Sequence, residues 1–288
     1  MAKILRGADA LEAKCAELKD KVRRLRNEGT DPVLAIIRVG EDPDNMAYER
    51  GLVKRAEELG IMVEKYVMDE KATETTVIAL IRRLNYDDDI HGVLLMRPLP
   101  EHMDDNKVRM TLDPAKDLDG ITDVSIAGVF AGTDRGFPPC TPSGCIELLE
   151  HYGIRIAGKK AVVIGRSMVT GRPLSMMLMR KNATVTLCHS HTSPEDLIRY
   201  CHNADLIFVM VGKPKTIKTE HVRPGQVIVD IGINVDKNGK LCGDTDFDNL
   251  LPIVKAITPV PGGVGAMTSV MLLEHLITAA VRSRKGLS

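Results

Sequence analysis

The sequence predicts an α/β protein with two lobes. Helical and strand patterns alternate in two stretches, one before residue 98 and one from residue 159. A repeated strand–helix–strand order builds a mostly parallel sheet. Between the two stretches, residues 98–142 are rich in proline and glycine, which is typical of a functional or interdomain loop. We therefore expect one domain over 1–139 with 267–288 and a second over 140–266, with the C-terminal helix returning to the first lobe.

The first stretch begins with an amphipathic helix, because apolar residues recur at helical spacing from Leu11 to Leu25 before Gly29. The run at 33–37 is short, apolar and β-branched, which is typical of a strand buried on both faces. The remaining patterns of this lobe predict strands at 61–67 and 92–96 and helices at about 44–59 and 73–84.

The second stretch opens with Thr141-Pro142, which we interpret as a helix N-cap followed by proline at the first helical position. Ser193-Pro194 is a second helix start of the same kind. The other elements expected here are strands at 161–164, 184–187, 206–210 and 227–231, and helices at 173–180 and 268–281.

Composition excludes several classes of protein. The 288 residues carry 39 Lys plus Arg against 39 Asp plus Glu. The net charge is therefore zero, and the chain as a whole does not attract the phosphates of a nucleic acid. Aromatic residues are only 3%, which disfavours base-stacking platforms. No apolar run approaches the roughly 20 residues of a membrane helix, and the N-terminus has no apolar signal-peptide region. We expect a soluble, cytoplasmic protein.

The six cysteines are scattered through the chain and are expected to be reduced thiols. Cys188, His189 and His191 resemble metal ligands by residue type, but alternate side chains of a strand point in opposite directions. No second ligand pair stands at a zinc-like spacing. We therefore expect no metal site.

The loop from Gly165 to Gly171 follows a predicted strand and opens a predicted helix. Glycines there allow a tight turn in which backbone amides approach a pyrophosphate at a helix N-terminus, as in Rossmann folds. An ordinary strand–helix turn is the alternative, since the spacing is not G-x-G-x-x-G. No Asp or Glu occurs between Gly165 and Glu195, where an acid would bind the NAD ribose. With Arg166 in the loop, this pattern favours NADP over NAD.

Two further segments carry unusual residues. Thr258 to Gly265 holds two prolines and three of the chain's glycines, which suits close backbone approach to a ligand or a rigid hinge. Asp117 and Asp119 flank Leu118 in the long loop, where they either accept hydrogen bonds from a polar heterocycle or cap a turn.

These segments carry a family resemblance. The chain is similar over essentially its whole length to the bifunctional methylenetetrahydrofolate dehydrogenase/methenyltetrahydrofolate cyclohydrolase (FolD) family. The segments that carry it, in family order, are VGEDPDNMAY, RPLP, KDLDGI, PPCTPSG, GRSMVTGRP, ATVTLCHSHT, VRPGQVIVDIGIN, GDTDF and ITPVPGGVGAMT.

The resemblance implies a folate-binding, catalytic domain at 1–139 with 267–288, a Rossmann NAD(P)-binding domain at 140–266, a cytoplasmic homodimer, and a role in one-carbon metabolism. A hydride passes from methylenetetrahydrofolate to NADP, and water then opens the cationic methenyl product. By the family pattern, Tyr48 and Asp119 are catalytic and contact the folate. The other implied contacts are Pro261, Gly262 and Gly263 at the substrate, and Gly165, Arg166, Ser167, Gly171, His189, Ser190 and Ile233 at the cofactor.

The chain departs from the family pattern at the catalytic centre. The family lysine four residues after the tyrosine is Leu52, the family glutamine is Met96, and the usual serine is Asn45. Ring opening needs a group that takes a proton from water and returns one, which a lysine can do and Leu52 cannot. On a helix, Lys54 points roughly 120° away from Tyr48, and Arg55 lies about 10 Å along the axis.

Hydride transfer needs orientation and exclusion of water but no proton transfer. The leading hypothesis is therefore an NADP-dependent dehydrogenase with weak or absent cyclohydrolase activity. Two alternatives stay open. One is a full bifunctional enzyme in which Tyr48, Asp119 and a water carry the protons. The other is a folate- or nucleotide-binding paralogue without catalysis.

Overall fold

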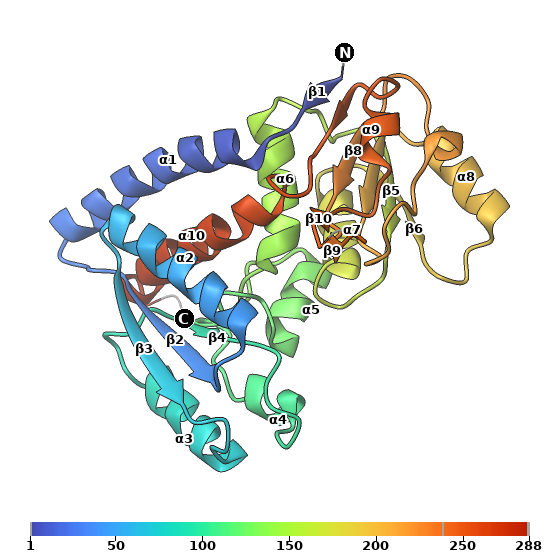
Figure 1. Ribbon diagram of the computed structural model, residues 1–288. Coiled ribbons are helices and arrows are strands. Elements are labelled where there is room, and N and C mark those ends of the chain that lie inside the picture. Colours follow the sequence, from blue (N-terminus) through green and yellow to red (C-terminus); the bar gives the residue numbers. More distant parts are fainter. Residues whose placement is uncertain (1, 238, 287–288) are drawn as a thin grey trace. The chain divides into compact units, whose positions relative to one another are not determined.

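The computed structural model describes residues 2–237 and 239–286, and these form two compact units. Residues 2–12 and 139–268 make up the six-stranded unit, and residues 13–138 and 269–286 make up the three-stranded unit. Helices α1 (Gly7–Asn27) and α10 (Gly265–Arg284) each begin in the six-stranded unit and continue into the three-stranded unit (Figure 1). Both sheets are parallel, as the strand–helix alternation predicts.

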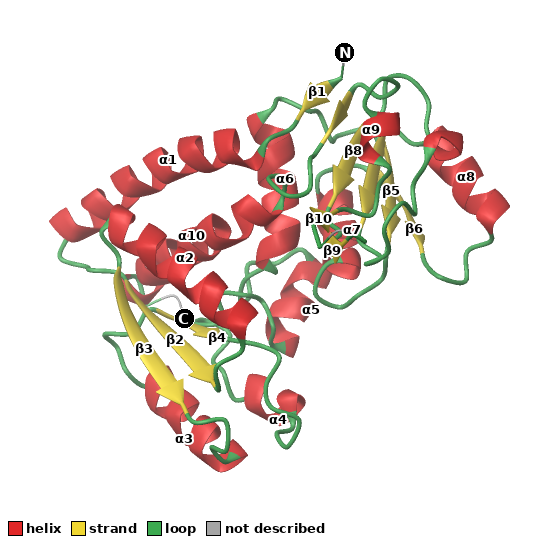
Figure 2. Ribbon diagram, in the orientation of Figure 1, coloured by secondary structure: helices red, strands yellow, loops and turns green. Residues whose placement is uncertain are grey.

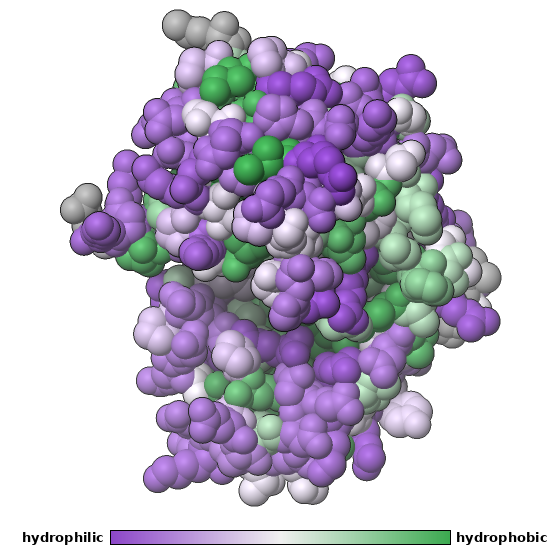
Figure 3. Space-filling view, turned by 90° about the vertical axis from the view of Figure 1, so that its right-hand side faces the viewer, coloured by the Kyte–Doolittle hydropathy of each residue, from purple (hydrophilic) through white to green (hydrophobic). Residues whose placement is uncertain are grey.

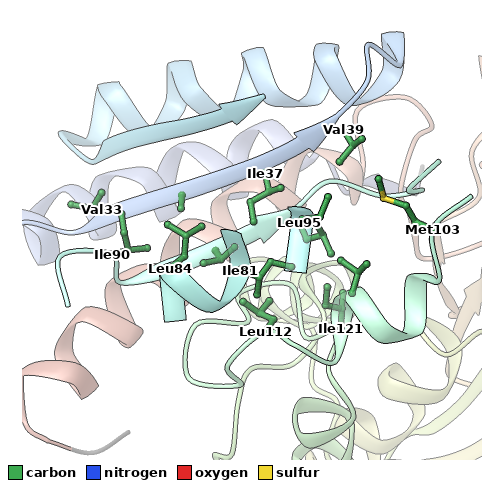
Figure 4. Packing of buried hydrophobic residues seen from close by; sticks show 14 residues of the cluster. Val33, Ile37, Val39, Ile81, Leu84, Ile90, Leu95, Met103, Leu112 and Ile121 are labelled. Carbon is green, nitrogen blue, oxygen red and sulfur yellow. The ribbon is translucent and has the colours of Figure 1, made fainter. Parts of the chain in front are cut away.

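The sheet of the three-stranded unit has the order β3–β2–β4, with β2 (Val33–Val39) between β3 (Met62–Met68) and β4 (Gly92–Leu95). Every residue of β2 is buried, as expected for a strand covered on both faces. Helix α2 (Pro43–Leu59) covers one face, and α3 (Glu74–Asn85) covers the other (Figure 1). Figure 4 shows the core beneath β2, where Ile37 packs with Ile81 and Leu84 of α3.

Local signals in the sequence set the limits of α2. The Asp42 carboxylate accepts a hydrogen bond from the Asn45 N–H at 2.8 Å, and Pro43 occupies the first helical position. Gly60 ends the helix in the left-handed conformation, with φ 77°. The side chains that lie on α2 therefore project from a helix with fixed ends.

The sheet of the six-stranded unit has the order β1–β11–β8–β7–β5–β6. Figure 2 draws its strands in yellow, flanked by red helices. The chain runs outward from β5 (Lys160–Ile164) to β6 (Thr184–Cys188), then crosses back to β7 (Leu206–Val209) and continues through β8 (Val227–Asp230) and β11 (Ala256–Ile257). The direction reverses between β5 and β7, and such a switch point is where open α/β sheets bind ligands. The remaining elements of this unit are α6 (Cys140–His151), α7 (Gly171–Arg180), α8 (Pro194–Asn203), η1 (Thr219–His221), α9 (Phe247–Leu250) and the antiparallel pair β9 (Asn234–Val235) and β10 (Leu241–Cys242).

Three features differ from the sequence-based expectations. Strand β1 (Lys3–Ile4) pairs with β11, so the first residues belong to the six-stranded unit rather than to the N-terminal lobe. The loop expected at 98–142 contains α4 (Asp105–Arg109) and α5 (Asp123–Ala131), with N-caps at Asp104 and Thr122. Thr141 is not an N-cap, because α6 begins at Cys140 after Pro139 and has no side-chain cap. Ser193 does cap α8, accepting from the Asp196 N–H at 3.1 Å.

The surface is ordinary for a globular protein. The face shown in Figure 3 is mainly hydrophilic, with hydrophobic residues in small areas. Across the residues that the structure describes, no helix combines the length and the apolar character needed to cross a membrane.

Candidate active site

The loop between β5 and α7 doubles back on itself at the switch point of the six-stranded unit. Gly165 has φ 126°, and a Cβ placed on it would lie 2.5 Å from the carbonyl oxygen of Met210, which follows β7. A Cβ on Gly171 would overlap the carbonyl oxygen of Gly165. Glycine is therefore required at both positions.

The open end of this loop suits an anion. Helix α7 has ten residues and begins at Gly171, and Thr170 before it provides no side-chain cap. The Gly171 N–H points to the Ser167 hydroxyl at 3.4 Å, and both Ser167 and Arg166 are exposed. A helix N-terminus with a serine and an arginine beside it is an anion-binding arrangement.

Histidines rather than carboxylates follow the end of β6. The His189 N–H donates to the Thr192 hydroxyl at 3.0 Å, and the His191 N–H donates to His189 Nδ1 at 3.2 Å. When the His189 ring is neutral, Nδ1 is thus the acceptor and Nε2 carries the proton. In the described part of the chain, no three His, Cys, Asp or Glu side chains gather in a way that would hold a metal ion.

A pocket of about 240 Å³ opens at the ends of β8 and β11, within the six-stranded unit. Ile233, Pro261, Gly262 and Gly263 all line it, so the structure brings four of the sequence-predicted site residues together. Ile233 is 70% exposed, so its side chain is accessible at the surface of the pocket. Gly262 is fixed by its carbonyl oxygen, which accepts the Gly7 N–H at 2.8 Å.

Two buried aspartates shape the loops around this pocket. The Asp244 carboxylate accepts from the N–H groups of Val211 at 2.6 Å and Lys213 at 2.9 Å. The Asp230 carboxylate accepts from the Asp244 and Thr245 N–H groups, at 3.0 and 2.8 Å. Burial raises the pKa of Asp230, although its hydrogen bonds oppose that shift. Sequence reasoning gave neither aspartate a role. The available signals were the segments that contain them, VRPGQVIVDIGIN for Asp230 and GDTDF for Asp244.

In the three-stranded unit, α2 carries Tyr48 and two of the three positions expected to depart from the family pattern, Asn45 and Leu52. Tyr48 is half-buried, and Leu52, one turn further on, has no exposed surface. Between them, the buried Glu49 carboxylate accepts from Arg38 Nε at 2.7 Å and lies 3.7 Å from Lys65 Nζ. Glu49 is thus held in an ion pair.

The cationic neighbours of Leu52 on the same helix are placed elsewhere. Arg55 donates to the Ser269 hydroxyl on α10, and Lys54 is exposed. This agrees with the helical geometry expected from the sequence, in which neither side chain shares the position of Leu52 relative to Tyr48.

Met96 and Asp119 lie in segments that pack on the same sheet. Met96 is 4% exposed, and its N–H continues the ladder by donating to the Ile37 carbonyl oxygen at 2.9 Å. The loop that holds Asp119 crosses β4, where the Val93 N–H donates to the Lys116 carbonyl oxygen at 2.8 Å. Asp119 itself is half-buried.

Of the two aspartates in this loop, Asp117 has a structural role. Its carboxylate is fully buried and accepts from the Ile121 N–H, the Thr122 N–H and hydroxyl, and the Ser125 hydroxyl, at 2.7–3.0 Å. It thereby anchors the start of α5. The turn-cap interpretation is right for Asp117, which leaves Asp119 as the candidate for contact with a heterocycle.

Comparison with known proteins identifies the family. The model of the tetrahydrofolate dehydrogenase/cyclohydrolase catalytic domain matches residues 5–119, and the model of the NAD(P)-binding domain of the same family matches residues 139–284. The chain belongs to the tetrahydrofolate dehydrogenase/cyclohydrolase family. The resemblance inferred from the sequence motifs is therefore confirmed.

Relatives match this family member over nearly its whole length. The bifunctional protein FolD of Agathobacter rectalis is 45% identical over 266 residues, which are 92% of this chain and 94% of the relative. The bifunctional protein FolD of Carboxydothermus hydrogenoformans is 43% identical and covers 97% of each chain.

Solved structures agree with the fold. The FolD enzyme of Campylobacter jejuni has a TM-score of 0.94 at 39% identity, covering 98% of this chain and 99% of its own. The Trypanosoma brucei dehydrogenase-cyclohydrolase, complexed with NADP cofactor and an inhibitor, has a TM-score of 0.91 at 31% identity over 99% of each chain. The two-lobed α/β prediction is thus confirmed.

Proposed function

We propose that this chain is an NADP-dependent 5,10-methylenetetrahydrofolate dehydrogenase whose cyclohydrolase activity is weak or absent. Family membership supports the dehydrogenase reaction on a tetrahydrofolate substrate. The observation that carries the division of activities is the fully buried Leu52 at the position of the family lysine. We also propose that 13–138 with α10 binds the folate, and that the six-stranded unit binds the coenzyme.

The coenzyme unit fits a dinucleotide. The glycine loop ends at the N-terminus of α7, where a pyrophosphate can bind, and Arg166 and Ser167 are exposed beside it. Ser190 and the Nε2–H of His189 supply donors after β6, where no carboxylate repels a phosphate. These hydrogen-bond donors, without a nearby carboxylate in the loop after β6, favour binding of a ribose 2′-phosphate and therefore of NADP over NAD. When bound, the nicotinamide accepts the hydride.

The residues of the chain have positioning roles in the first reaction. In our proposal Tyr48 flanks the folate ring, Asp119 accepts hydrogen bonds from the pterin, and Pro261–Gly263 contact the substrate. Oxidation of the methylene bridge moves a hydride and leaves a delocalised cation, so no side chain has to take up a proton in that step. The loss of a basic residue at position 52 is compatible with this reaction.

Hydrolysis of the methenyl product makes a different demand. Water adds to the cationic carbon, loses a proton, and the ring nitrogen must gain one when the ring opens. Leu52 has no proton to give or accept, and the thioether of Met96 is only a weak acceptor. Glu49 is tied to Arg38, and Arg55 to Ser269. Of the α2 side chains that our proposal places at the folate, only Tyr48 carries an exchangeable proton.

Two other functions stay possible outcomes of the same experiment. The relatives at 43–45% identity are named bifunctional, which favours a full bifunctional enzyme in which Tyr48, Asp119 and a water carry the protons. A non-catalytic paralogue is disfavoured because a scaffold needs no phosphate-binding loop. The homodimer and the cytoplasmic location stay predictions from the family pattern.

The test uses the purified protein with methylenetetrahydrofolate and NADP. NADPH and the methenyl product are followed separately, with spontaneous hydrolysis as the control. NADPH formation with accumulation of methenyltetrahydrofolate supports the proposal. Consumption of the methenyl product as fast as it forms contradicts the loss of the second activity, and absence of NADPH contradicts the dehydrogenase.

A further inference from the structure

A buried histidine supports the loop of Asp119 from the C-terminal helix. His275 lies on α10 in the three-stranded unit, and its Nδ1 is 2.8 Å from the carbonyl oxygen of Leu118. Leu118 stands directly between the anchored Asp117 and Asp119. The family pattern used above gives His275 no role, and the sequence around it carries no motif that would have indicated one.

The ring of His275 is held in place by stacking. Phe137 stacks on it with ring centroids 5.1 Å apart and planes inclined by 29°. The Arg282 guanidinium lies 4.6 Å from the centroid of Phe137 and donates to the Gly136 carbonyl oxygen at 3.1 Å. These contacts leave the imidazole little freedom to rotate away from Leu118.

The protonation state of the ring follows from its surroundings. A carbonyl oxygen only accepts hydrogen bonds, so Nδ1 of His275 must be the donor. Burial lowers the pKa of His275, while the backbone bond to Leu118 and the charges of Glu274 and Asp117 oppose that shift and Arg282 adds to it. The ring is therefore neutral at physiological pH, with its proton on Nδ1.

The loop is consequently fixed at Asp117 and at Leu118. Upstream, the Asp117 carboxylate binds the backbone of Ile121 and Thr122 and draws the turn onto α5. At Leu118 itself, His275 holds the carbonyl group, and the orientation of that peptide plane sets where the N–H and Cα of Asp119 point. A shift of this plane moves the Asp119 carboxylate directly.

We propose that His275 is a positioning residue for substrate binding, acting through the Leu118 carbonyl group to orient Asp119 toward the folate. This inference rests on the folate-contacting role of Asp119 in the proposed function. A merely structural histidine would stabilise the fold without a specific effect on folate affinity.

The test compares His275→Asn with His275→Leu. The Asn side chain can place an N–H close to the position of Nδ1, whereas Leu fills the space without a donor. We expect the Leu variant to raise the KM for methylenetetrahydrofolate by about 10-fold, which corresponds to the loss of one hydrogen bond of about 1.4 kcal/mol. The KM for NADP should stay unchanged in both variants. The folate KM of the Asn variant should stay close to that of the wild type.

A second measurement separates positioning from stability. Tetrahydrofolate binding is measured by calorimetry for Asp119→Asn with and without His275→Leu. If His275 acts through Asp119, adding His275→Leu to Asp119→Asn weakens binding far less than 10-fold, because the two effects are not additive. Full additivity overturns the proposal, as does an unchanged folate KM in a folded His275→Leu variant.

The design also covers two other results. If His275→Leu does not fold, His275→Asn is compared with the wild type, and a folate KM raised more than 10-fold by Asn would overturn the proposal. If the wild type binds tetrahydrofolate but forms no NADPH, the proposed dehydrogenase fails while the calorimetric test of His275 still decides the positioning role.

Discussion

Gly171 packs directly against the carbonyl oxygen of Gly165, at the point where the chain reverses between β5 and α7. A Cβ atom on Gly171 would overlap that oxygen and lie 3.1 Å from the Cα of Arg166. Both obstacles are backbone atoms, which cannot rotate away as a flexible side chain can. The shape of the proposed phosphate loop therefore depends on the absence of a side chain at this position.

We expect Gly171→Ala to weaken NADP binding strongly and to lower the melting temperature. The extra methyl group must displace the Gly165–Arg166 backbone, and overpacking of this kind costs roughly 1–3 kcal/mol. Calorimetric titration with NADP and a thermal melt measure the two effects. Normal NADP affinity in this variant would contradict the placement of the coenzyme at this loop.

Gly51→Ala is the matched control. Gly51 lies within α2 and is exposed, and a Cβ placed on it would meet no atom within 4 Å beyond the backbone of its own helix. Because alanine restricts the unfolded chain and favours the helix, this variant should be more stable than the wild type by about 0.5–1 kcal/mol. The same substitution thus has opposite signs at the two glycines.

Arg166 should decide the preference for NADP over NAD. Replacement by Ala removes the exposed guanidinium beside the proposed phosphate site, and a hydrogen bond to a charged group is worth about 1.5–3 kcal/mol. We expect the KM for NADP to rise roughly 10- to 100-fold, while the KM for NAD changes little. Arg199→Ala is the control, since Arg199 pairs with Asp196 on α8 of the same unit. An equal loss for both coenzymes would show that Arg166 does not read the 2′-phosphate.

Restoring the family residues should restore hydrolysis. In the Leu52→Lys, Met96→Gln double variant, a lysine and an amide occupy the two buried positions, and general acid–base catalysis typically contributes about 10²- to 10⁴-fold. We expect methenyltetrahydrofolate hydrolysis to rise at least about 100-fold, with NADPH formation retained. Leu52→Met with Met96→Gln is the control without a proton carrier, and an equal rate in both would rule out the role of position 52.

The buried ion pair between Arg38 and Glu49 fixes α2 on β2. Glu49→Gln leaves the Arg38 charge buried without its partner, which costs roughly 3–5 kcal/mol. The Arg38→Met, Glu49→Leu double variant removes both charges and should regain most of that loss. Urea unfolding of the single and double variants measures the coupling, and additive losses would show that the pair is not a unit.

Much of the fold was predictable from sequence because its signals are local. The buried run of β2 and the glycine that ends α2 are each recognisable within a few residues. Strand β1 was missed because Lys3–Ile4 is too short to show a period and is defined only by its pairing with β11. The Thr141-Pro142 signal failed because α6 begins two residues earlier than a proline at its first position would require.

The sequence predicted those candidate site residues that lie within the family motifs. Pro261–Gly263 and Ile233 stand far apart in sequence yet line one pocket. Their roles at the substrate and at the cofactor stay predictions from the family pattern. Asp244 and His275 were not predicted, because their roles are long-range hydrogen bonds. The Asp244 carboxylate holds a loop 31–33 residues earlier, and His275 bonds to a carbonyl 157 residues away. Such contacts exist only once the chain is folded.

Stability should fall as the pH drops below the usual histidine range. Burial lowers the pKa of His91, His221 and His275 from the ordinary value of 6.5. Above that value both states are neutral and these groups have no effect. Below it the unfolded chain takes up protons that the folded chain does not, so each histidine favours unfolding by up to about 1.4 kcal/mol per pH unit. The raised pKa of Asp230 acts in the opposite direction.

His275→Asn isolates one of these contributions. The free energy of unfolding in urea is measured between about pH 7.5 and 5.0 for the wild type and the variant. Because Asn does not titrate, the unfolding free energy of the variant should fall less steeply with falling pH below about pH 6.5, by up to about 1.4 kcal/mol per pH unit. Asp230, His91 and His221 contribute equally to both proteins. Parallel curves of unfolding free energy against pH for the two proteins would contradict this prediction. They would mean that His275 takes up a proton as readily in the folded chain as in the unfolded one, despite its burial against Phe137 and Leu118.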